Sequence, residues 1–252
     1  RSSALASKAT GFPIALVSAM LASGLTLDEI PCGKYGTLDK YVPDGDYIVL
    51  KFARWAFEKF KGVEDKLGTQ MRAVGEVMSI GRTVEESLLK AVRSLEIGLF
   101  HLYDAKFDDM TETQLLDYIQ IGTDDRIYAI AQLLRLGCDI DRIHSVSAID
   151  AFFLQKLSHI VQMEQLLQEH PGDSKFLKMA KQTGFSDKEI GLLWQMDEKD
   201  IFHIRKQHGI LPVYKMIDSC ASEFDSYIPY FYSTYEKENE SIVSDKHKII
   251  VL

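Results

Sequence analysis

Residues 72–98 hold the local pattern that most constrains the fold, because a strand, a tight glycine turn and a capped helix follow one another there. The strand-forming residues before Gly81 are Val74, Val77 and Ile80. Thr83 and Glu86 have the spacing of a capping box, in which the hydroxyl and the carboxylate each accept a hydrogen bond from a free backbone N–H group. Apolar residues then recur at helical spacing, at Leu88, Leu89, Val92 and Leu95. The pattern predicts a strand over 74–80 and a helix that ends at Gly98.

The segment before this pattern predicts a small amount of mixed structure. Residues 47–52 are strand-forming and are expected to lie beside 74–80 in one sheet. Short helices are predicted over 2–8 and 13–22, and residues 31–45 are rich in Gly and Pro and are expected to be loop. Residues 1–97 are therefore predicted to be α+β.

After Gly98 the strand signal almost disappears and helix signals follow one another. Expected helix starts are Thr111 with Gln114, Thr123 before two aspartates, Ser147 before Ile149-Asp150, and Ser186 with Glu189. Expected helix ends are Gly122, Gly137, Gly184 and Gly209. The net charge of −8 also arises entirely after residue 97. The fold class is therefore α+β followed by all-α, with a domain boundary between residues 97 and 98 and a polar linker at 236–247.

Several chemistries find no support in the residue patterns. The longest apolar stretch, 13–25, is interrupted by Ser and Gly and is shorter than the roughly 20 residues that cross a bilayer. No glycine loop of the kind that holds phosphates is present. His203 and His208 are five residues apart, whereas a zinc-binding helical pair needs four. We predict no metal site, no membrane span and reduced cysteines.

Residues 184–210 resemble a helix-turn-helix, so a DNA-binding module is a competing class. The second helix carries Arg205, Lys206 and His208, but it also carries Asp197, Glu198 and Asp200. Nucleic-acid binding relies on clustered Lys and Arg. The acidic character of residues 98–252 therefore disfavours this alternative.

Longer motifs resemble one enzyme family. Residues 71–83, Met-Arg-Ala-Val-Gly-Glu-Val-Met-Ser-Ile-Gly-Arg-Thr, resemble a signature of the large subunit of carbamoyl-phosphate synthetase. Similar likenesses occur in the same order in the segments 1–15, 46–51, 57–60, 125–131, 184–187, 212–218, 232–236 and 248–252. The family enzyme is several times longer than 252 residues. The chain is therefore expected to be a piece from its middle.

The resemblance implies three segments. Residues 1–97 would be the C-terminal end of the first, carboxyphosphate-forming ATP-grasp domain, a truncated lobe with a few β-strands. Residues 98–245 would be a multi-helix oligomerisation domain, and 246–252 the truncated start of the next domain. The parent would be a cytoplasmic ligase that makes carbamoyl phosphate from bicarbonate, glutamine-derived ammonia and two ATP, for arginine and pyrimidine biosynthesis.

The resemblance also implies cofactors, partners and site residues. The parent would use ATP, magnesium or manganese, and potassium, and would bind a glutaminase small subunit; the fragment alone would hold no cofactor and would be inactive. Arg1 corresponds to a residue beside bicarbonate and carboxyphosphate, where a guanidinium can hold an oxyanion. Glu76 corresponds to the mouth of a carbamate tunnel, Met71 to its wall, and Ser2 to a monovalent-cation position.

Self-association is expected through the helical domain. The helix that carries Leu115, Leu116 and Ile119 resembles the association segment of the family, and an apolar face exposed on it would gain by burial. A second hypothesis is that the isolated chain acts only as a helical interaction module. The acidic helix-turn-helix binder is the third.

Overall fold

The computed structural model describes residues 7, 12–42, 45–55, 57, 62, 66–69, 73–217, 230–241, 244–247 and 249. The chain forms two compact units, one of residues 47–211 and the other of residues 1–46 with 212–252. The larger unit crosses the boundary predicted between residues 97 and 98. It does so because helix α3 (Val84–Ser94) packs both on the strands before it and on helices α7 (Ala151–Glu169) and α8 (Ser174–Thr183).

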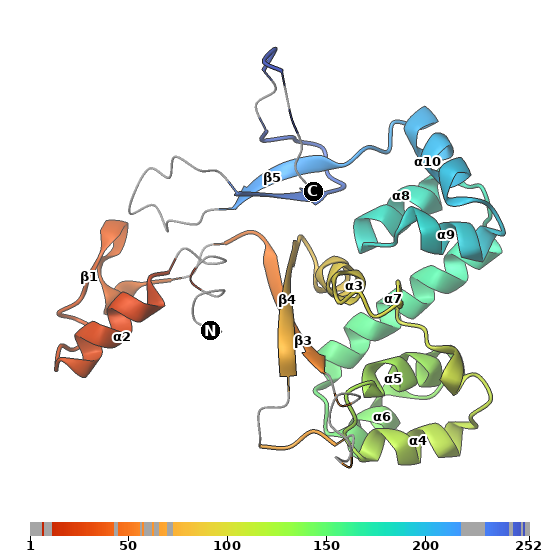
Figure 1. Ribbon diagram of the computed structural model, residues 1–252, viewed down its shortest axis with the longest axis horizontal. Coiled ribbons are helices and arrows are strands. Elements are labelled where there is room, and N and C mark those ends of the chain that lie inside the picture. Colours follow the sequence, from red (N-terminus) through yellow and green to blue (C-terminus); the bar gives the residue numbers. More distant parts are fainter. Residues whose placement is uncertain are drawn as a thin grey trace. The chain divides into compact units, whose positions relative to one another are not determined.

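The larger unit begins with two antiparallel strands, β3 (Ile48–Trp55) and β4 (Ala73–Gly81), which pair along their length (Figure 1). Helix α3 packs against both strands. The prediction that 47–52 and 74–80 are neighbours in one sheet is therefore confirmed. The helix ends at Ser94, earlier than predicted, because Glu96 already adopts a positive φ of 53°.

The rest of this unit is helical. Helix α7 contacts α5 (Arg126–Arg135) and α6 (Ile140–Ser147) as well as α8 and α9 (Asp187–Trp194), so it joins the two groups of shorter helices (Figure 1). The shorter helices are α4 (Glu112–Gln120), α5 (Arg126–Arg135), α6 (Ile140–Ser147), α8, α9 (Asp187–Trp194) and α10 (Glu198–Gln207). A 3-10 turn at Ala105–Phe107 precedes α4. The predicted helical character of this region is confirmed.

The N-caps show which helix starts could be predicted from the sequence. Thr111 forms a complete capping box with Gln114, and Ser186 accepts a hydrogen bond from the backbone of Glu189, as predicted. The starts predicted at Thr123 and Ser147 are wrong, because α5 and α7 begin after aspartates. Among the described α-helices, the aspartates that cap with a side-chain hydrogen bond are Asp139, Asp150 and Asp173.

The expected association face of α4 is part of the core. Leu115 and Ile119 are 0% exposed and Leu116 is 6% exposed. Helix α4 packs against α5 and α6, and these three side chains are among those it buries. The expectation that they form an exposed contact face is therefore wrong: the helix has its apolar face covered within its own chain.

The smaller unit holds α2 (Ile14–Ala22), the short antiparallel pair β1 (Pro31–Cys32) and β2 (Gly36–Thr37), and two 3-10 turns at Gly33–Tyr35 and Leu38–Lys40. Its second strand pair is β5 (Val213–Ile217) with β6 (Tyr230–Thr234). This pair corrects the prediction that residues 98–245 are all-α. The segment predicted as a polar linker also pairs with β5, since the Glu240 carboxylate accepts a hydrogen bond from the Met216 N–H at 2.7 Å.

Candidate functional site

Glu76 is the one predicted catalytic-region residue that the structure describes. It lies on β4, is exposed, and forms an ion pair with Lys51 on the neighbouring strand β3. Arg1, Ser2 and Met71 lie outside the described residues. Of these four predicted residues, the structure therefore gives the position of Glu76 alone.

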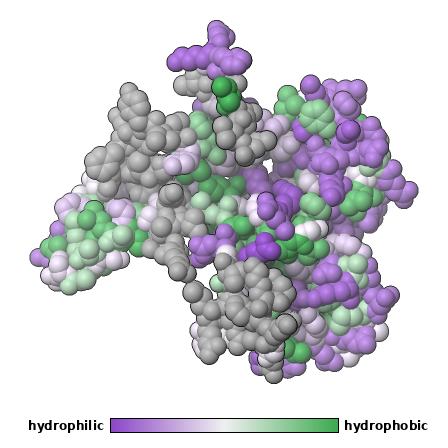
Figure 2. All heavy atoms as spheres, in the orientation of Figure 1, coloured by the Kyte–Doolittle hydropathy of each residue, from purple (hydrophilic) through white to green (hydrophobic). Residues whose placement is uncertain are grey.

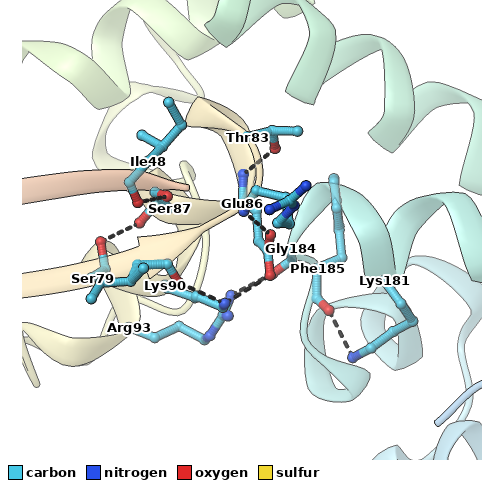
Figure 3. A network of polar contacts seen from close by, with 12 residues as sticks. Ile48, Ser79, Thr83, Glu86, Ser87, Lys90, Arg93, Lys181, Gly184 and Phe185 are labelled. Carbon is cyan, nitrogen blue, oxygen red and sulfur yellow. Dashed lines mark hydrogen bonds and ion pairs between the residues drawn. The ribbon is translucent and has the colours of Figure 1, made fainter. Parts of the chain in front are cut away.

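The strand that carries Glu76 is fixed to the helices by a cluster of polar groups, which we call the α3 junction: Ser79, Thr83, Glu86, Ser87, Lys90, Arg93 and Gly184 (Figure 3). Most of these residues come from β4, the turn after it, and α3. Gly184, the C-cap of α8, comes from a helix about ninety residues further along the chain. The junction therefore joins segments that are distant in sequence.

On the strand side, α3 is bonded to both strands. The Ser87 hydroxyl donates to the Ile48 carbonyl on β3 at 3.1 Å, and the Ser79 hydroxyl on β4 donates to the Ser87 carbonyl at 2.6 Å (Figure 3). The Lys90 ammonium donates to the Ile80 carbonyl at 2.8 Å. These bonds use side chains that are buried or half-buried, where an unpaired polar group is costly. They hold the start of α3 in one position on the strand pair.

The turn between β4 and α3 is closed by Glu86. Its carboxylate accepts a hydrogen bond from the Arg82 N–H at 2.7 Å, while its own N–H donates to the Thr83 hydroxyl at 3.1 Å. Lys90 lies 2.7 Å from the same carboxylate. Burial lowers the pKa of Lys90, although the negative charge of Glu86 opposes that effect. The predicted capping pair is thus present, with the carboxylate bonded one residue earlier than in a standard capping box.

On the helix side, α3 meets the end of α8 in direct backbone contact. A Cβ atom placed on Gly184 would lie 2.8 Å from the Glu86 Cα, and Gly184 has a φ of +103°. The Arg93 guanidinium donates to the Gly184 carbonyl at 2.8 Å (Figure 3). Only glycine combines this conformation with so close an approach. Helix α3 is therefore held by hydrogen bonds to β3 and β4 on one side and by close backbone contact with the end of α8 on the other.

A second buried polar cluster lies between α5, α7 and α9. Arg135 binds the Glu164 carboxylate through two nitrogens, with distances of 2.9 and 3.1 Å, and also donates to the Leu102 carbonyl. His101 is 2% exposed, and its Nε2 lies 3.5 Å from Glu164. Burial raises the pKa of Glu164, but the polar groups of His101 and Arg135 outweigh it and bring that pKa below its ordinary value.

Glu189 on α9 faces the same cluster. Burial raises the pKa of Glu189, and the negative charge of Glu164 adds to this effect, whereas His101 and Arg135 oppose it. Two neighbouring carboxyl groups thus have pKa values shifted in opposite directions. Such a split makes the stability of this region depend on pH.

The helix-turn-helix segment is an internally bonded helix pair. Arg205 on α10 is 9% exposed and donates to the Asp187 carboxylate on α9 at 2.6 Å. Lys181 on α8 binds the same carboxylate at 2.7 Å, and burial lowers the pKa of Lys181. Both cations are therefore used inside the fold. On the face shown in Figure 2, hydrophilic residues cover most of α8–α10, and apolar residues appear between them.

A cleft lies between the start of α3, α7 and α8 and has a volume of about 430 Å³. Its charged wall consists of Glu85, Lys156 and His159, with Glu85 Oε1 3.0 Å from His159 Nδ1 and 3.4 Å from Lys156 Nζ. Its apolar wall consists of Met163, Leu166 and Met179. Among the described residues that line the cleft, these three charged side chains therefore pair with one another.

A model of the carbamoyl-phosphate synthetase large chain oligomerisation domain matches residues 76–209. The chain belongs to this family. The match begins at Glu76, takes in the α3 junction and the helices through α10, and ends before β5. Membership supports a role in carbamoyl phosphate synthesis and in self-association. The match covers most of β4 as well as helices that the sequence assigned to this domain.

Two properties of the described residues bear on other classes of protein. None of the helices in those residues is both long and apolar enough to cross a membrane. Within the same part of the chain, no group of three or more His, Cys, Asp or Glu side chains is arranged to hold a metal ion.

The sequence did not reveal the α3 junction as a site. Its contacts to Gly184 and Ile48 join residues 91 and 39 positions apart, which no local pattern encodes. Gly184 did carry a sequence signal, because a glycine there predicts a helix end. That signal does not show that Gly184 also lies against the backbone of Glu86. Buried groups such as Glu164 and His101 carried no sequence signal, because charged and polar residues are usually exposed.

Proposed function

We propose that this chain is part of a carbamoyl-phosphate synthetase large subunit and contributes an edge of the first active site together with an oligomerisation domain. The observation that carries the proposal is the family match over residues 76–209. The motif resemblance of residues 1–15 and 71–83 extends it toward the first ATP-grasp domain. In this proposal the parent consumes bicarbonate, two ATP and ammonia from a glutaminase subunit, with magnesium or manganese and potassium as cofactors.

Within the proposal, Arg1 contacts bicarbonate or carboxyphosphate, Ser2 lies near a monovalent cation, and Glu76 and Met71 line a carbamate tunnel. The position of Glu76 is compatible with such a role. Its carboxylate is exposed and pairs with Lys51 at a site open to solvent, where ion pairs contribute about 0–1 kcal/mol. A pair this weak exchanges readily for another partner.

The α3 junction gives the proposal a mechanical basis. A tunnel mouth must keep its position relative to the rest of the enzyme, and Glu76 lies three residues before Ser79, the first junction residue on β4. Three hydrogen bonds from α3 and β4 and the backbone contact at Gly184 hold this strand against the helices. We infer that the helical unit serves as the rigid support of the strand that carries Glu76.

The test uses the intact large subunit with its glutaminase partner. Glu76→Ala is expected to raise the ratio of ATP hydrolysed to carbamoyl phosphate formed, because a tunnel residue guides an unstable intermediate and does not transfer phosphate. Glu169→Ala, which removes an exposed carboxylate at the end of α7, is the matched control. A ratio in Glu76→Ala equal to that in the control would reject the tunnel role.

For self-association, the structure points away from the buried face of α4. The start of α7 instead exposes two adjacent aromatic side chains, Phe152 at 48% and Phe153 at 55%, with ring centroids 5.3 Å apart. Aromatic residues are enriched at protein interfaces. We propose that this pair contributes to contact between copies of the chain.

Sedimentation velocity over a range of concentrations tests this contact. Association of the wild-type chain is expected to weaken in the double variant Phe152→Ser/Phe153→Ser. Leu192→Ser, which removes an exposed apolar side chain from α9, is the control and should associate like wild type. If the aromatic variant associates as strongly as the control, the contact lies elsewhere; a wild-type chain that stays monomeric at every concentration would contradict self-association itself.

A further inference from the structure

The buried polar cluster between α5, α7 and α9 contains two groups that bind protons and that the fold leaves unequally paired. We call its four members, His101, Arg135, Glu164 and Glu189, the His101 cluster, and all of them belong to the unit of residues 47–211. They come from four segments, which are the stretch after α3 and the helices α5, α7 and α9. A change of charge in the cluster therefore acts on several elements at once.

His101 is the member without a hydrogen bond. It is 2% exposed, and neither Nδ1 nor Nε2 has a hydrogen-bond partner among the described residues. Nε2 lies 3.5 Å from a carboxylate oxygen of Glu164, and the ring packs on Phe185 with ring centroids 4.7 Å apart. A neutral imidazole here leaves a donor and an acceptor unpaired, which is costly for a buried group. By taking up a proton, His101 gains an ionic contact with Glu164.

Glu189 is the second group that binds a proton. It is 8% exposed, and burial raises its pKa. A positive charge on His101 opposes that effect, as do Arg135 and Arg93, whereas the negative charge of Glu164 adds to it. Glu189 therefore ionises more easily when His101 is protonated. Because such coupling is reciprocal, His101 also holds its proton more tightly when Glu189 is ionised.

The other charged groups near α9 are engaged in ion pairs of their own. Arg135 binds Glu164 through two nitrogens at 2.9 and 3.1 Å. Lys181 from α8 and Arg205 from α10 both bind the Asp187 carboxylate at the start of α9. These pairs combine a strong base with a carboxylate, and they keep their charges near neutral pH. His101 and Glu189 are therefore the members of this region whose charges change most readily with pH.

The packing of α9 on α7 is the contact that these two groups would control. The two helices contact each other directly, and the Trp194 Nε1–H at the end of α9 donates to the Leu167 carbonyl on α7 at 2.7 Å. When both protons are lost, Glu164 on α7 and Glu189 on α9 are both negative and no imidazolium lies beside them. Like charges in a buried site disfavour each other. Helix α9 should then be held less tightly on α7.

We propose that the His101 cluster is a pH-sensitive latch, in which His101 and Glu189 share a proton whose loss weakens the packing of α9 on α7. A carboxyl group with a raised pKa in the folded state favours folding at low pH, and this contribution is lost as the pH rises through that pKa. The latch is therefore closed at acidic pH and loosens as the pH rises. It is independent of the proposed carbamoyl-phosphate chemistry, because its members belong neither to the α3 junction nor to the predicted tunnel.

An NMR titration of the imidazole signals in the whole chain tests the sharing of the proton, with the His101 signal assigned by its loss in His101→Gln. The midpoint of His101 in Glu189→Gln should lie below that in wild type by about 0.5 pH unit or more, because an ionised neighbour stabilises the imidazolium. Glu198→Gln removes an exposed carboxylate from α10 and should leave the midpoint unchanged. Equal midpoints in wild type and Glu189→Gln would overturn the proposal, as would a His101 signal that does not titrate.

Hydrogen exchange of the Trp194 indole N–H tests the movement of α9, since this group is bonded to α7. Trp55→Phe assigns its signal, because the chain has two tryptophans. Protection relative to a free indole should fall about tenfold or more from pH 5 to pH 8 in wild type, since one pKa unit between the closed and the loosened state is a factor of ten. In Glu189→Gln it should change less. The same dependence of protection on pH in both proteins would show that Glu189 does not control the packing of α9.

Discussion

Replacing Gly184 by alanine tests how tightly the helices hold the strand pair. Gly184 ends α8 with a φ of +103°, and a Cβ atom there would meet the Glu86 Cα at 2.8 Å and the Glu86 carbonyl oxygen at 3.1 Å. Both neighbours are backbone atoms within the first turn of α3. They cannot rotate away as a side chain would, so the helices must separate.

The expected loss has two parts. A non-glycine residue in a left-handed conformation costs about 1–2 kcal/mol. Forcing an additional carbon into a packed contact costs typically about 1–3 kcal/mol. The Gly184→Ala protein should therefore lose about 2–5 kcal/mol of unfolding free energy, reduced by the roughly 0.4–1 kcal/mol that any Gly→Ala change gains by restricting the unfolded chain.

Gly137→Ala is the matched control for the conformational part. Gly137 follows α5 with a φ of +81°, and a Cβ atom placed there would meet nothing within 4 Å. The conformational strain and the unfolded-state effect are then common to both variants. The difference between them, about 1–3 kcal/mol, measures the backbone contact between α8 and α3.

Urea unfolding monitored by tryptophan fluorescence is a suitable assay, because both tryptophans, Trp55 and Trp194, lie in the unit of residues 47–211. With a slope of roughly 2 kcal/mol per M, a difference of 2 kcal/mol moves the midpoint by about 1 M. If Gly184→Ala and Gly137→Ala unfold at the same midpoint, the close approach does not contribute to stability and the α3 junction is not a rigid support.

Three further predictions follow from buried groups. Leu115→Glu buries an unpaired charge and should destabilise the fold by roughly 2–5 kcal/mol, as a severe core change does. Thr113→Glu on the exposed face of α4 is the control and should cost less than about 0.5 kcal/mol. Thermal unfolding of the two variants measures the difference. The folded-state pKa of Glu189 is raised, so its ionisation opposes folding once the pH exceeds its ordinary value of 4.5. Glu189→Gln should therefore gain stability relative to wild type as the pH rises from about 4 to 7, and a constant difference across that range would be inconsistent with the shift. The pKa of Glu164 is lowered, so Glu164→Gln should show the reverse trend and lose stability relative to wild type above its ordinary pKa of 4.5, as urea midpoints at several pH values would show.

The sequence predicted local structure well where one side chain closes one turn. Thr111 and Ser186 could be predicted as helix starts because the side chain of each accepts a hydrogen bond from the backbone N–H three residues later. Asp139, Asp150 and Asp173 cap helices by the same physics, bonding two residues ahead, but their own sequence signal is weaker because no Glu or Gln completes a capping box. Local chemistry thus gave the helical character of this region better than the boundaries of its elements, and it did not predict the strands β5 and β6.

The sequence did not show which apolar face would remain exposed. Leu115, Leu116 and Ile119 have the same helical spacing whether they bind another copy or pack inside the chain, and periodicity records only that they are to be buried. The three side chains are buried within the chain because α4 packs against α5 and α6. This packing depends on how the connections between the helices run. The adjacent pair Phe152 and Phe153 shows the opposite case, because both of these apolar side chains remain exposed at the start of α7.

The same reasoning explains why the helix-turn-helix likeness does not extend to function. A recognition helix presents its cations to phosphates and base edges. Here Asp187 binds both Lys181 and Arg205, so the negative charge on α9 turns two cations of the neighbouring helices inward. Replacing Asp187 by asparagine would release them but would also leave two buried cations without their anion, a change that typically costs 3–5 kcal/mol. The positive charges of Lys181 and Arg205, which would attract nucleic acid, are therefore the charges that bind Asp187 and hold α8, α9 and α10 together.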